Sequence, residues 1–172
     1  ILETLQALDV SISGASEARC VSVRDDVLAA EAVDRHSSEL APVMKVLRQS
    51  ADEALDRGPY SVTDKTTLPP SGNKQDYWHP APYWWPDPKK PDGLPYLRKD
   101  GERVPGTRMY EPDSEKYDRT RLQRVFDDSL MLALAAKVFG EKRYADHGAK
   151  ILERFFVDRK TRMKPHLKFG QV

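Results

Sequence analysis

Apolar residues recur at three- and four-residue steps in two parts of the chain, the spacing that places side chains on one face of a helix. The first helix is predicted to begin near residue 40, with Ser38 as its N-cap and Pro42 in its first turn. Gly58 followed by Pro59 predicts where it ends. The apolar face of this helix is predicted to hold Leu40, Val43, Leu47, Ala51 and Ala54.

The widest apolar stripe follows Asp118, which is predicted to cap a helix over residues 119–139. Gly140 breaks the pattern, and a second helix is predicted over residues 142–156. Two such helices joined by a short glycine turn form an αα-hairpin. The stripe of the first helix holds Leu122, Val125, Phe126, Ser129, Leu130, Ala133, Leu134 and Val138, and that of the second holds Tyr144, Gly148, Ile151, Leu152 and Phe155.

Residues 58–110 separate these helical parts and are rich in proline and aromatic residues. The stretch SGNKQDYWHPAPYWWPDPKKPDGLPYLRKDG, from Ser71 to Gly101, contains all 3 tryptophans and several of the 13 prolines. Each proline fixes φ and removes a backbone donor, which excludes a helix interior or a central strand. Because disordered segments are poor in aromatic residues, we predict an ordered but irregular loop.

These patterns predict a mostly α-helical chain of three segments that form one incomplete domain. Residues 1–57 are expected to hold N-terminal helices, including short ones over residues 2–8 and 25–34. Residues 58–110 are expected to form a loop that lines a cleft. Residues 111–172 are expected to hold the helical hairpin and a basic tail. Residues 110–118 show no clear period and are expected to be exposed.

Charge and composition narrow the possible partners. The net charge of +1, with 32% charged residues, gives no overall attraction to nucleic acid or to an anionic membrane. A basic tail follows Asp158, but no nucleic-acid motif accompanies it, so a solvated face is the favoured interpretation and nucleic acid is an unlikely partner. The cations of this tail are Arg159, Lys160, Arg162, Lys164 and Lys168.

Neither a metal nor a cofactor is predicted. Cys20 is the single cysteine and is expected to be a small buried residue, and the 4 histidines lack metal-ligand spacing. No glycine loop that could cradle phosphate is present, and no apolar run reaches the roughly 20 residues that span a bilayer. No signal peptide is visible, but the chain begins at Ile1 rather than at methionine, which suggests processing and permits secretion.

Aromatic faces on a stiff backbone, interleaved with cations, suit a flat, polar, anionic ligand, so the loop predicts a polysaccharide cleft. Trp84 and Trp85 are the candidates for stacking on sugar rings. Adjacent residues of an extended backbone point to opposite sides, so one of the two could instead anchor the core. Tyr83 and His79 are weak catalytic candidates, because a hydroxyl or an imidazole can transfer a proton.

Other polar residues of the loop suit an acidic sugar. Arg98 could bind a carboxylate through its bidentate fork. For Arg98 and Lys74, the alternative is a surface salt bridge to Asp76 or Asp100. The further candidates for substrate binding are Lys74, whose ammonium suits a carboxylate, and Tyr77, whose hydroxyl could contact the ligand.

The run from Gly58 to Gly106, together with the run from Val138 to Gln171, resembles the alginate-lyase-type polysaccharide lyases. Members typically show a similar block, SGDKHDY…APYWWPDP…DGLPY…RDG, early in the domain, followed by a comparable helical segment. The two runs cover about half of this chain in the expected order. The resemblance implies a fold of repeated αα-hairpins, called an α/α toroid. It also implies an enzyme that cleaves a polyuronate by β-elimination.

The resemblance also implies which parts lie elsewhere. Proteins of this family carry the asparagine–histidine pair and the tyrosine credited with catalysis in the second half of the domain, and no NNH-like element occurs here. Gln171 and Lys168 lie where the chain of the family returns to the cleft, so Gln171 is a further candidate for substrate binding. The chain is therefore expected to be the N-terminal half of the domain, inactive alone, with the C-terminal half as a possible partner.

Two functional hypotheses follow. The first is a lyase that acts on an acidic polysaccharide of alginate or glucuronan type, without a cofactor, in the extracellular space or the periplasm. The second is a non-catalytic carbohydrate-binding protein, or lectin, on the same scaffold. A helical module that binds nucleic acid rests on the basic tail alone and is a remote third.

Overall fold

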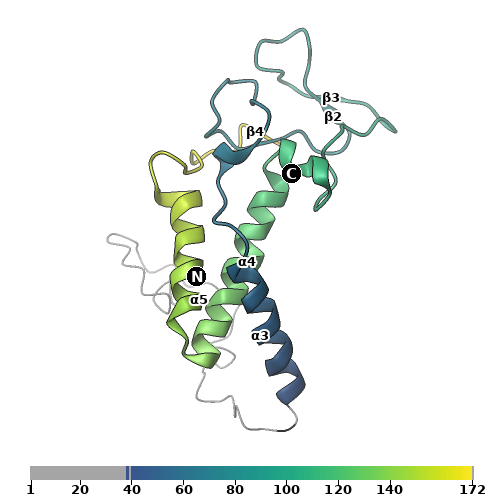
Figure 1. Ribbon diagram of the computed structural model, residues 1–172. Coiled ribbons are helices and arrows are strands. Elements are labelled where there is room, and N and C mark those ends of the chain that lie inside the picture. The colour runs from purple at the N-terminus through teal and green to yellow at the C-terminus, as the bar shows by residue number, and fades with distance from the viewer. Residues whose placement is uncertain (1–37, 39, 172) are drawn as a thin grey trace. The chain divides into compact units, whose positions relative to one another are not determined.

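The structure is a computed structural model that describes residue 38 and residues 40–171 of the chain (Figure 1). The predicted helices over residues 2–8 and 25–34, and Cys20, lie outside the described residues. Among the residues that are described, no helix is long and apolar enough to cross a membrane. The chain divides into two compact units, which are considered separately below.

The first unit contains residues 38, 40–59 and 126–152 of the described chain and is helical. Helix α3 spans Ala41–Leu55 and carries Pro42 in its first turn, as predicted. The prediction of Ser38 as N-cap was wrong, because Leu40 occupies that position and makes no side-chain cap. Ala51 and Ala54 are fully buried, whereas Val43 is 62% exposed, so only the C-terminal part of the predicted apolar face is covered.

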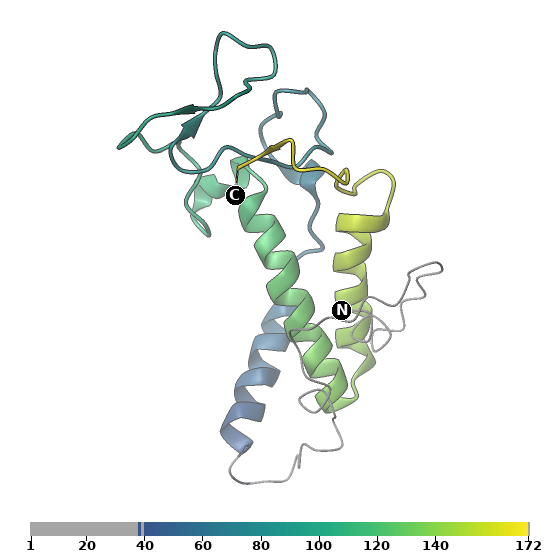
Figure 2. The ribbon, with the colours of Figure 1, turned by 180° about the vertical axis from the view of Figure 1, so that it is seen from behind.

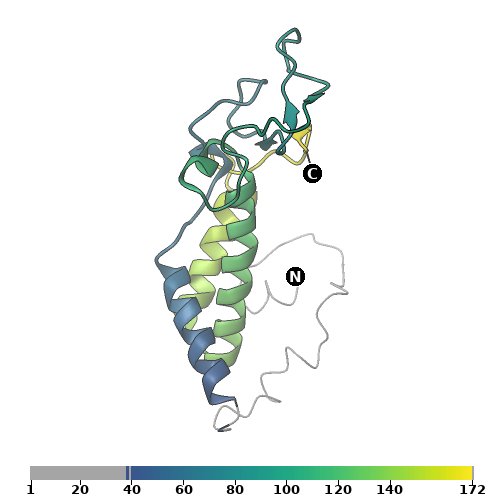
Figure 3. The same cartoon turned by 90° about the vertical axis from the view of Figure 1, so that its right-hand side faces the viewer.

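Helix α4 spans Arg119–Phe139 and helix α5 spans Lys142–Leu152, joined at Gly140 as the sequence predicts. Within the first unit, the stretch of α4 from residue 126 lies beside α3 and α5 (Figures 1 and 3). Ala133 of α4 packs against Ala145 of α5. This mostly α-helical arrangement confirms the coarse fold class.

The buried face of α4 is rotated from the predicted stripe. Phe126 and Leu130 were placed in that stripe, yet they are 52% and 53% exposed. Leu132 and Ala135, which were left out of it, are fully buried. Small alanine side chains let neighbouring helices approach closely. We infer that packing selects the face with Leu132 and Ala135 as the buried one, although it is less uniformly apolar than the predicted stripe.

The second unit contains residues 60–125 and 153–171 of the described chain and holds most of the predicted loop. Its first residues form the 3-10 turn η2, Val62–Asp64, and a later one, η3, spans Pro112–Lys116. A π-helical turn, η4, spans Glu153–Val157, where the sequence predicted that the last helix would continue. Ser114 and Asp118 are buried, so the prediction that residues 110–118 would be exposed was wrong in part.

Two small sheets, which the sequence did not predict, organise this loop. Strand β1, Trp78–His79, pairs in parallel with β4, Phe169–Gly170, and Figure 2 shows the C-terminal segment returning to the loops. Strand β2, Trp84–Trp85, pairs antiparallel with β3, Leu97–Arg98. Each strand has only two residues, and the prolines next to β1, β2 and β3 cannot donate to a longer ladder.

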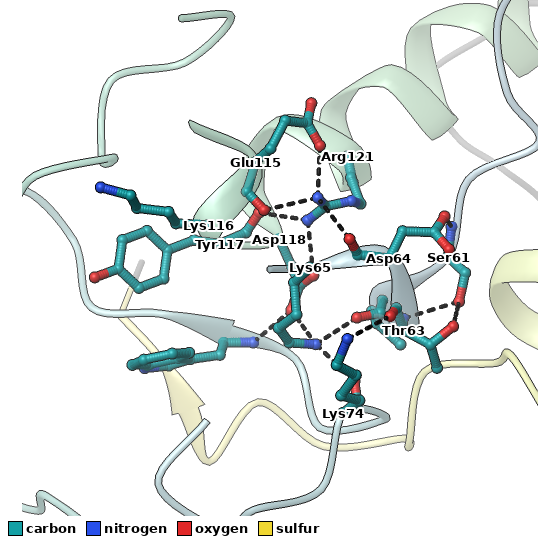
Figure 4. A network of polar contacts seen from close by, with 12 residues as sticks. Ser61, Thr63, Asp64, Lys65, Lys74, Glu115, Lys116, Tyr117, Asp118 and Arg121 are labelled. Carbon is teal, nitrogen blue, oxygen red and sulfur yellow. Dashed lines mark hydrogen bonds and ion pairs between the residues drawn. The ribbon is translucent and has the colours of Figure 1, made fainter. Parts of the chain in front are cut away.

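A buried ion pair lies at the centre of the second unit (Figure 4). The Nζ atom of Lys65 lies 2.9 Å from Oδ2 of Asp118, and both side chains are fully buried. Lys65 also donates to the carbonyl oxygens of Val62, at 2.5 Å, and Lys74, at 2.6 Å. Burial lowers the pKa of Lys65 and raises that of Asp118, while the opposite charge of each partner opposes the shift.

Asp118 also ties helix α4 to strand β1. Its backbone N–H donates to the carbonyl oxygen of Trp78 at 3.0 Å, and its carboxylate accepts from the N–H of Trp78 at 2.9 Å. Asp118 stands immediately before α4, where the sequence placed a cap, but its carboxylate binds Lys65 and Trp78. Arg121 adds a second buried cation, which contacts Glu115 at 2.5 Å (Figure 4).

We expect Lys65→Met to destabilise the second unit severely, because it leaves the carboxylate of Asp118 buried without its main counter-ion. A cost of about 3–5 kcal/mol in the free energy of unfolding is typical when one partner of a buried pair is removed. Urea unfolding followed by tryptophan fluorescence measures it. The double variant Lys65→Met, Asp118→Asn should recover part of the loss, and strictly additive costs would contradict a coupled pair.

We expect Gly106→Ala to destabilise the protein more than Gly101→Ala does, although the two glycines have nearly the same φ, +84° and +85°. A Cβ at position 106 would lie 2.8 Å from the carbonyl oxygen of Asp113, whereas at position 101 nothing lies within 4 Å. The positive φ alone costs about 1 kcal/mol in either variant, and the clash adds about 1–3 kcal/mol. Equal unfolding midpoints in urea would refute the clash.

Candidate functional site

The structure sorts the predicted site residues into two groups, both in the second unit. The hairpin group lies on the β2–β3 sheet and the loops next to it, and consists of Tyr83, Trp84, Trp85 and Arg98. The ladder group lies on and beside the β1–β4 sheet, and consists of Tyr77, His79 and Gln171. Lys74 belongs to neither group; its Nζ atom lies 3.4 Å from the carbonyl oxygen of Thr63.

One face of the hairpin joins an aromatic ring to a guanidinium. Trp84 and Arg98 are directly opposed across the antiparallel pair, so their side chains stand on the same face. Trp84 is 37% exposed, and the side chain of Arg98 is 64% exposed. Arg98 contacts Asp100 at 2.8 Å, which is the surface salt bridge that the sequence left open as its alternative. An exposed pair of this kind contributes little stability, so a competing carboxylate can exchange with it.

The opposite face of the hairpin is occupied by contacts within the protein. Trp85 donates its indole N–H to the carbonyl oxygen of Glu102 at 3.0 Å, and the ammonium of Lys99 lies 5.1 Å from its ring. Arg103 lies 5.4 Å from the ring of Tyr83, which is 39% exposed. The two adjacent tryptophans thus differ as the alternation predicts: Trp84 presents a freer ring, and Trp85 holds the loop.

In the ladder group, Tyr77 is 7% exposed and packs against the backbone of Gly170. A Cβ at position 170 would lie 3.0 Å from the ring of Tyr77, so glycine allows this close approach. Burial raises the pKa of the Tyr77 hydroxyl to about 12, with the nearby carboxylate of Asp118 adding to the shift. Tyr77 therefore stays protonated at neutral pH and can act as a hydrogen-bond donor.

His79 is 1% exposed, and its Nδ1 atom accepts a hydrogen bond from the N–H of Ala81 at 3.1 Å. Burial lowers its pKa to about 4, and the positive charge of Arg119 adds to the effect. The ring is therefore neutral at neutral pH and removed from solvent. This placement suits a residue that shapes the loop better than one that exchanges protons with a substrate.

Two hydrogen bonds tie the C-terminal segment to this site. The N–H of Gln171 donates to the carbonyl oxygen of His79 at 2.8 Å, which places Gln171 beside the ladder and leaves its side chain half-buried. The hydroxyl of Tyr96, next to β3, donates to the carbonyl oxygen of Phe169 in β4 at 2.9 Å. Tyr96 thereby connects the hairpin group to the ladder group within one unit.

Sequence reasoning assigned no role to Arg103, Tyr96 or Arg119, and it counted Lys99 only among the cations of the loop. Lys99 and Arg103 belong to a charged run of the sequence. Their contacts with the rings of Trp85 and Tyr83 depend on how the hairpin folds. Tyr96 was visible as an aromatic residue among turn signals, but its partner lies 73 residues away along the chain. Arg119 carried a signal of its own, since a cation is unfavourable at the first position of a helix.

The exposed chemistry of the site consists of an aromatic face, guanidinium and ammonium groups, and tyrosine hydroxyls. Within residues 38 and 40–171, no three histidine, cysteine, aspartate or glutamate residues gather closely enough to hold a metal ion. The aromatic face can stack on a sugar ring, and the cations can bind its carboxylates. The arrangement suits recognition of an acidic sugar.

Comparisons with known proteins agree with this chemistry. The family model described as alginate lyase matches residues 61–172. The crystal structure of an alginate lyase from Bacteroides ovatus is 45% identical, with a TM-score of 0.59, over 77% of this chain. The match spans 33% of the length of that protein. No curated protein sequence matches the chain.

We expect the stability of the protein to fall between pH 6.5 and pH 4 because of His79. Its pKa is about 4 when folded and about 6.5 when unfolded, so in this window the unfolded state binds a proton that the folded state does not. The resulting loss is on the order of 2–4 kcal/mol in the free energy of unfolding, and it is absent above the unfolded pKa.

The control is His79→Asn, whose amide oxygen can accept from Ala81 N–H but cannot titrate. Urea unfolding at a series of pH values should show the wild type losing stability relative to this variant as the pH falls. Parallel curves for the two proteins would show that His79 titrates normally. The other three histidines, His36, His147 and His166, are present in both proteins, so they do not affect the comparison.

Proposed function

The chain belongs to the alginate lyase family, and from this premise we propose that it is part of a polysaccharide lyase that cleaves an acidic polyuronate by β-elimination. The proposed substrates are polymers of alginate or glucuronan type. The match to residues 61–172 and the 45% identity to an alginate lyase support the reaction class.

The observation that carries the substrate class is the cross-strand pair of Trp84 and Arg98. A uronate offers a sugar face of C–H groups on one side of its ring and a planar carboxylate at C6. An indole ring suits the first, and the fork of a guanidinium suits the second. Because the two side chains stand opposite each other on one face of the hairpin, a single sugar residue can use both.

The chemistry of the reaction defines what the remaining residues must supply. A base removes the proton at C5, the electron pair forms the C4=C5 double bond, and the glycosidic oxygen leaves C4 with a proton from an acid. Neutralising the C6 carboxylate makes the C5 proton more acidic, since negative charge develops next to it. Arg98 would hold the carboxylate of a bound sugar and so contribute to this step if the reacting sugar occupies its position.

Tyr83 is the better placed of the two weak catalytic candidates. Its ring is 39% exposed and lies beside Arg103, whereas His79 is buried and bonded to Ala81. Its ring lies on the face of the hairpin opposite to Trp84 and Arg98, so Tyr83 would act on a polymer that contacts both faces. Of the two, Tyr83 is the first residue to test.

We further propose that the chain forms the N-terminal half of an α/α toroid whose remaining hairpins complete the cleft. The α4–α5 hairpin provides one repeat of such a fold, and the match spans 33% of the solved relative. The C-terminal half of the domain would then be its partner, and the fragment alone would be inactive. A polymeric substrate of this kind is met outside the cytoplasm, which favours a secreted or periplasmic location.

The test is a lyase assay on the full-length protein with alginate, polymannuronate and glucuronan. Cleavage creates an unsaturated uronate at each new end, whose conjugated double bond absorbs in the ultraviolet. We expect Trp84→Ala to weaken binding of a uronate oligomer by about 1–3 kcal/mol, as loss of an aromatic stacking platform does elsewhere. Isothermal titration calorimetry measures that binding.

Leu97→Ala is the matched control, because Leu97 is 41% exposed but stands on the opposite face of the same hairpin. It should leave binding unchanged, and equal losses in the two variants would remove the Trp84 face from the site. Binding of uronate oligomers without any rise in absorbance would reject the lyase and support a non-catalytic carbohydrate-binding protein on the same scaffold. Neither binding nor cleavage would reject both.

A further inference from the structure

Asp76 is a buried carboxylate of the second unit and lies two residues before strand β1. Its side chain is 4% exposed, and its Oδ1 atom lies 2.9 Å from Nζ of Lys164 and 3.3 Å from Nε2 of His166. Burial would raise the pKa of Asp76, but contacts with Ser71 and Lys164 lower it overall. The carboxylate is therefore charged at neutral pH and attracts the ammonium of Lys164, which belongs to the C-terminal segment, residues 159–171.

The neighbouring residue, Gln75, holds the same segment through three hydrogen bonds. Its side-chain amide donates to the carbonyl oxygens of Arg159, at 2.9 Å, and Arg162, at 3.2 Å. Its own carbonyl oxygen accepts from the N–H of Lys164 at 2.9 Å. Gln75 and Asp76 therefore fix the C-terminal segment shortly before it reaches strand β4 (Figure 2).

The parallel ladder between β1 and β4 is too short to fix its own register. It pairs only Trp78 with Phe169 and His79 with Gly170. A slip by two residues would keep every side chain on the same face, so the alternation of the strands does not exclude it. Such a slip would move Gln171 by roughly 6–7 Å along β1, because a parallel strand rises about 3.3 Å per residue. Contacts outside the ladder therefore set the register.

The contacts next to β4 favour the observed register. The ring of His166, which lies beside Asp76, packs edge-on against the ring of Phe169, with 6.4 Å between the centroids. The hydroxyl of Tyr96 donates to the carbonyl oxygen of Phe169 at 2.9 Å. A slip of the strand would also separate Lys164 from the carboxylate of Asp76. Because a buried charge without its partner is costly, this ion pair opposes the slip.

We propose that Asp76 is a positioning residue that, through Lys164, sets the register of strand β4 and so holds Gln171 beside the ladder group. This assignment rests on the proposed function, in which Gln171 is a candidate for substrate binding. In the observed register the N–H of Gln171 donates to the carbonyl oxygen of His79 at 2.8 Å. Asp76 does not contact the sugar itself, since its carboxylate is buried and would repel that of a uronate.

The first test is amide hydrogen exchange of the full-length protein, resolved by residue. We expect Lys164→Gln to speed exchange of the Gln171 amide about tenfold, as the loss of one charge-assisted contact does. The amide of Asp118, which donates to the carbonyl oxygen of Trp78 in the same strand β1, should not change. Lys164→Arg should keep most of the protection, because a guanidinium also pairs with a carboxylate. Equal acceleration of both amides would show a role in stability alone, and no change in either would show that the pair does not hold β4.

Lys160→Gln is the matched control, because it removes the same charge from an exposed position of the same segment. It should leave exchange of the Gln171 amide unchanged, and an acceleration equal to that of Lys164→Gln would show a general effect of charge. Asp76→Asn removes the other partner and should act as Lys164→Gln does. The two variants combined should speed exchange no more than either alone, and additive effects would contradict a coupled pair. If Asp76→Asn does not fold, Lys164→Gln still decides, since its side chain is 41% exposed.

The second test is lyase kinetics of the full-length protein on a polyuronate. Lys164→Gln should raise KM about three- to tenfold with little change in kcat, the range for loss of one hydrogen bond to the substrate. In a Gln171→Ala background it should add no further increase, because it acts through Gln171. Additive increases, or an unchanged KM where exchange at Gln171 is faster, would overturn the positioning role and leave the proposed function standing. If the wild type cleaves no polyuronate, the proposed function fails, whereas hydrogen exchange still decides whether Asp76 sets the register.

Discussion

The second unit depends on the buried pair of Lys65 and Asp118. The ammonium of Lys65 donates to the carbonyl oxygens of Val62 and Lys74. Asp118 donates its backbone N–H to the carbonyl oxygen of Trp78, and its carboxylate accepts from the N–H of Trp78. A loop of this length contains too little regular structure to satisfy its own backbone groups, so buried charges take over that task. Because charges without partners are so costly in the interior, the loop has few alternative ways to fold.

This constraint explains why the candidate residues are ordered although they lie on strands of two residues. Pro80 follows β1 directly, and Pro82 and Pro86 lie on the two sides of β2, so long strands cannot form there. The loop is instead fixed by single bonds from distant segments, such as Tyr96 to Phe169 and Gln171 to His79. Rigid aromatic faces on such a frame are pre-organised for a ligand, which lowers the entropy lost on binding.

The sequence predicted the helices well, because periodicity and glycine breaks are local signals. The bounds of α4 and the turn at Gly140 followed from periodicity and the glycine break, whereas α3 ends at Leu55, before the predicted stop at Gly58. The rotation of the buried face from Phe126 to Leu132 could not be predicted, since it depends on which helix packs against α4. The pairing of Trp84 with Arg98 also escaped prediction, because it needs the register of a hairpin whose turn is long. Composition predicted an ordered, irregular loop, and long-range contacts decided which of its residues face solvent.

Three arginines of α4 show how position decides what the same side chain does. Arg121 is buried and binds Glu115 and the carbonyl groups near it, so it serves the fold. Arg124 contacts Glu115 at 3.0 Å and lies 5.9 Å from the ring of Tyr110, so it supports the same turn from the surface. Arg119 has the least favourable position of the three for helix stability and pairs with no described carboxylate. The fold therefore uses two of these arginines at the turn that contains Glu115, whereas Arg119 stays on the surface.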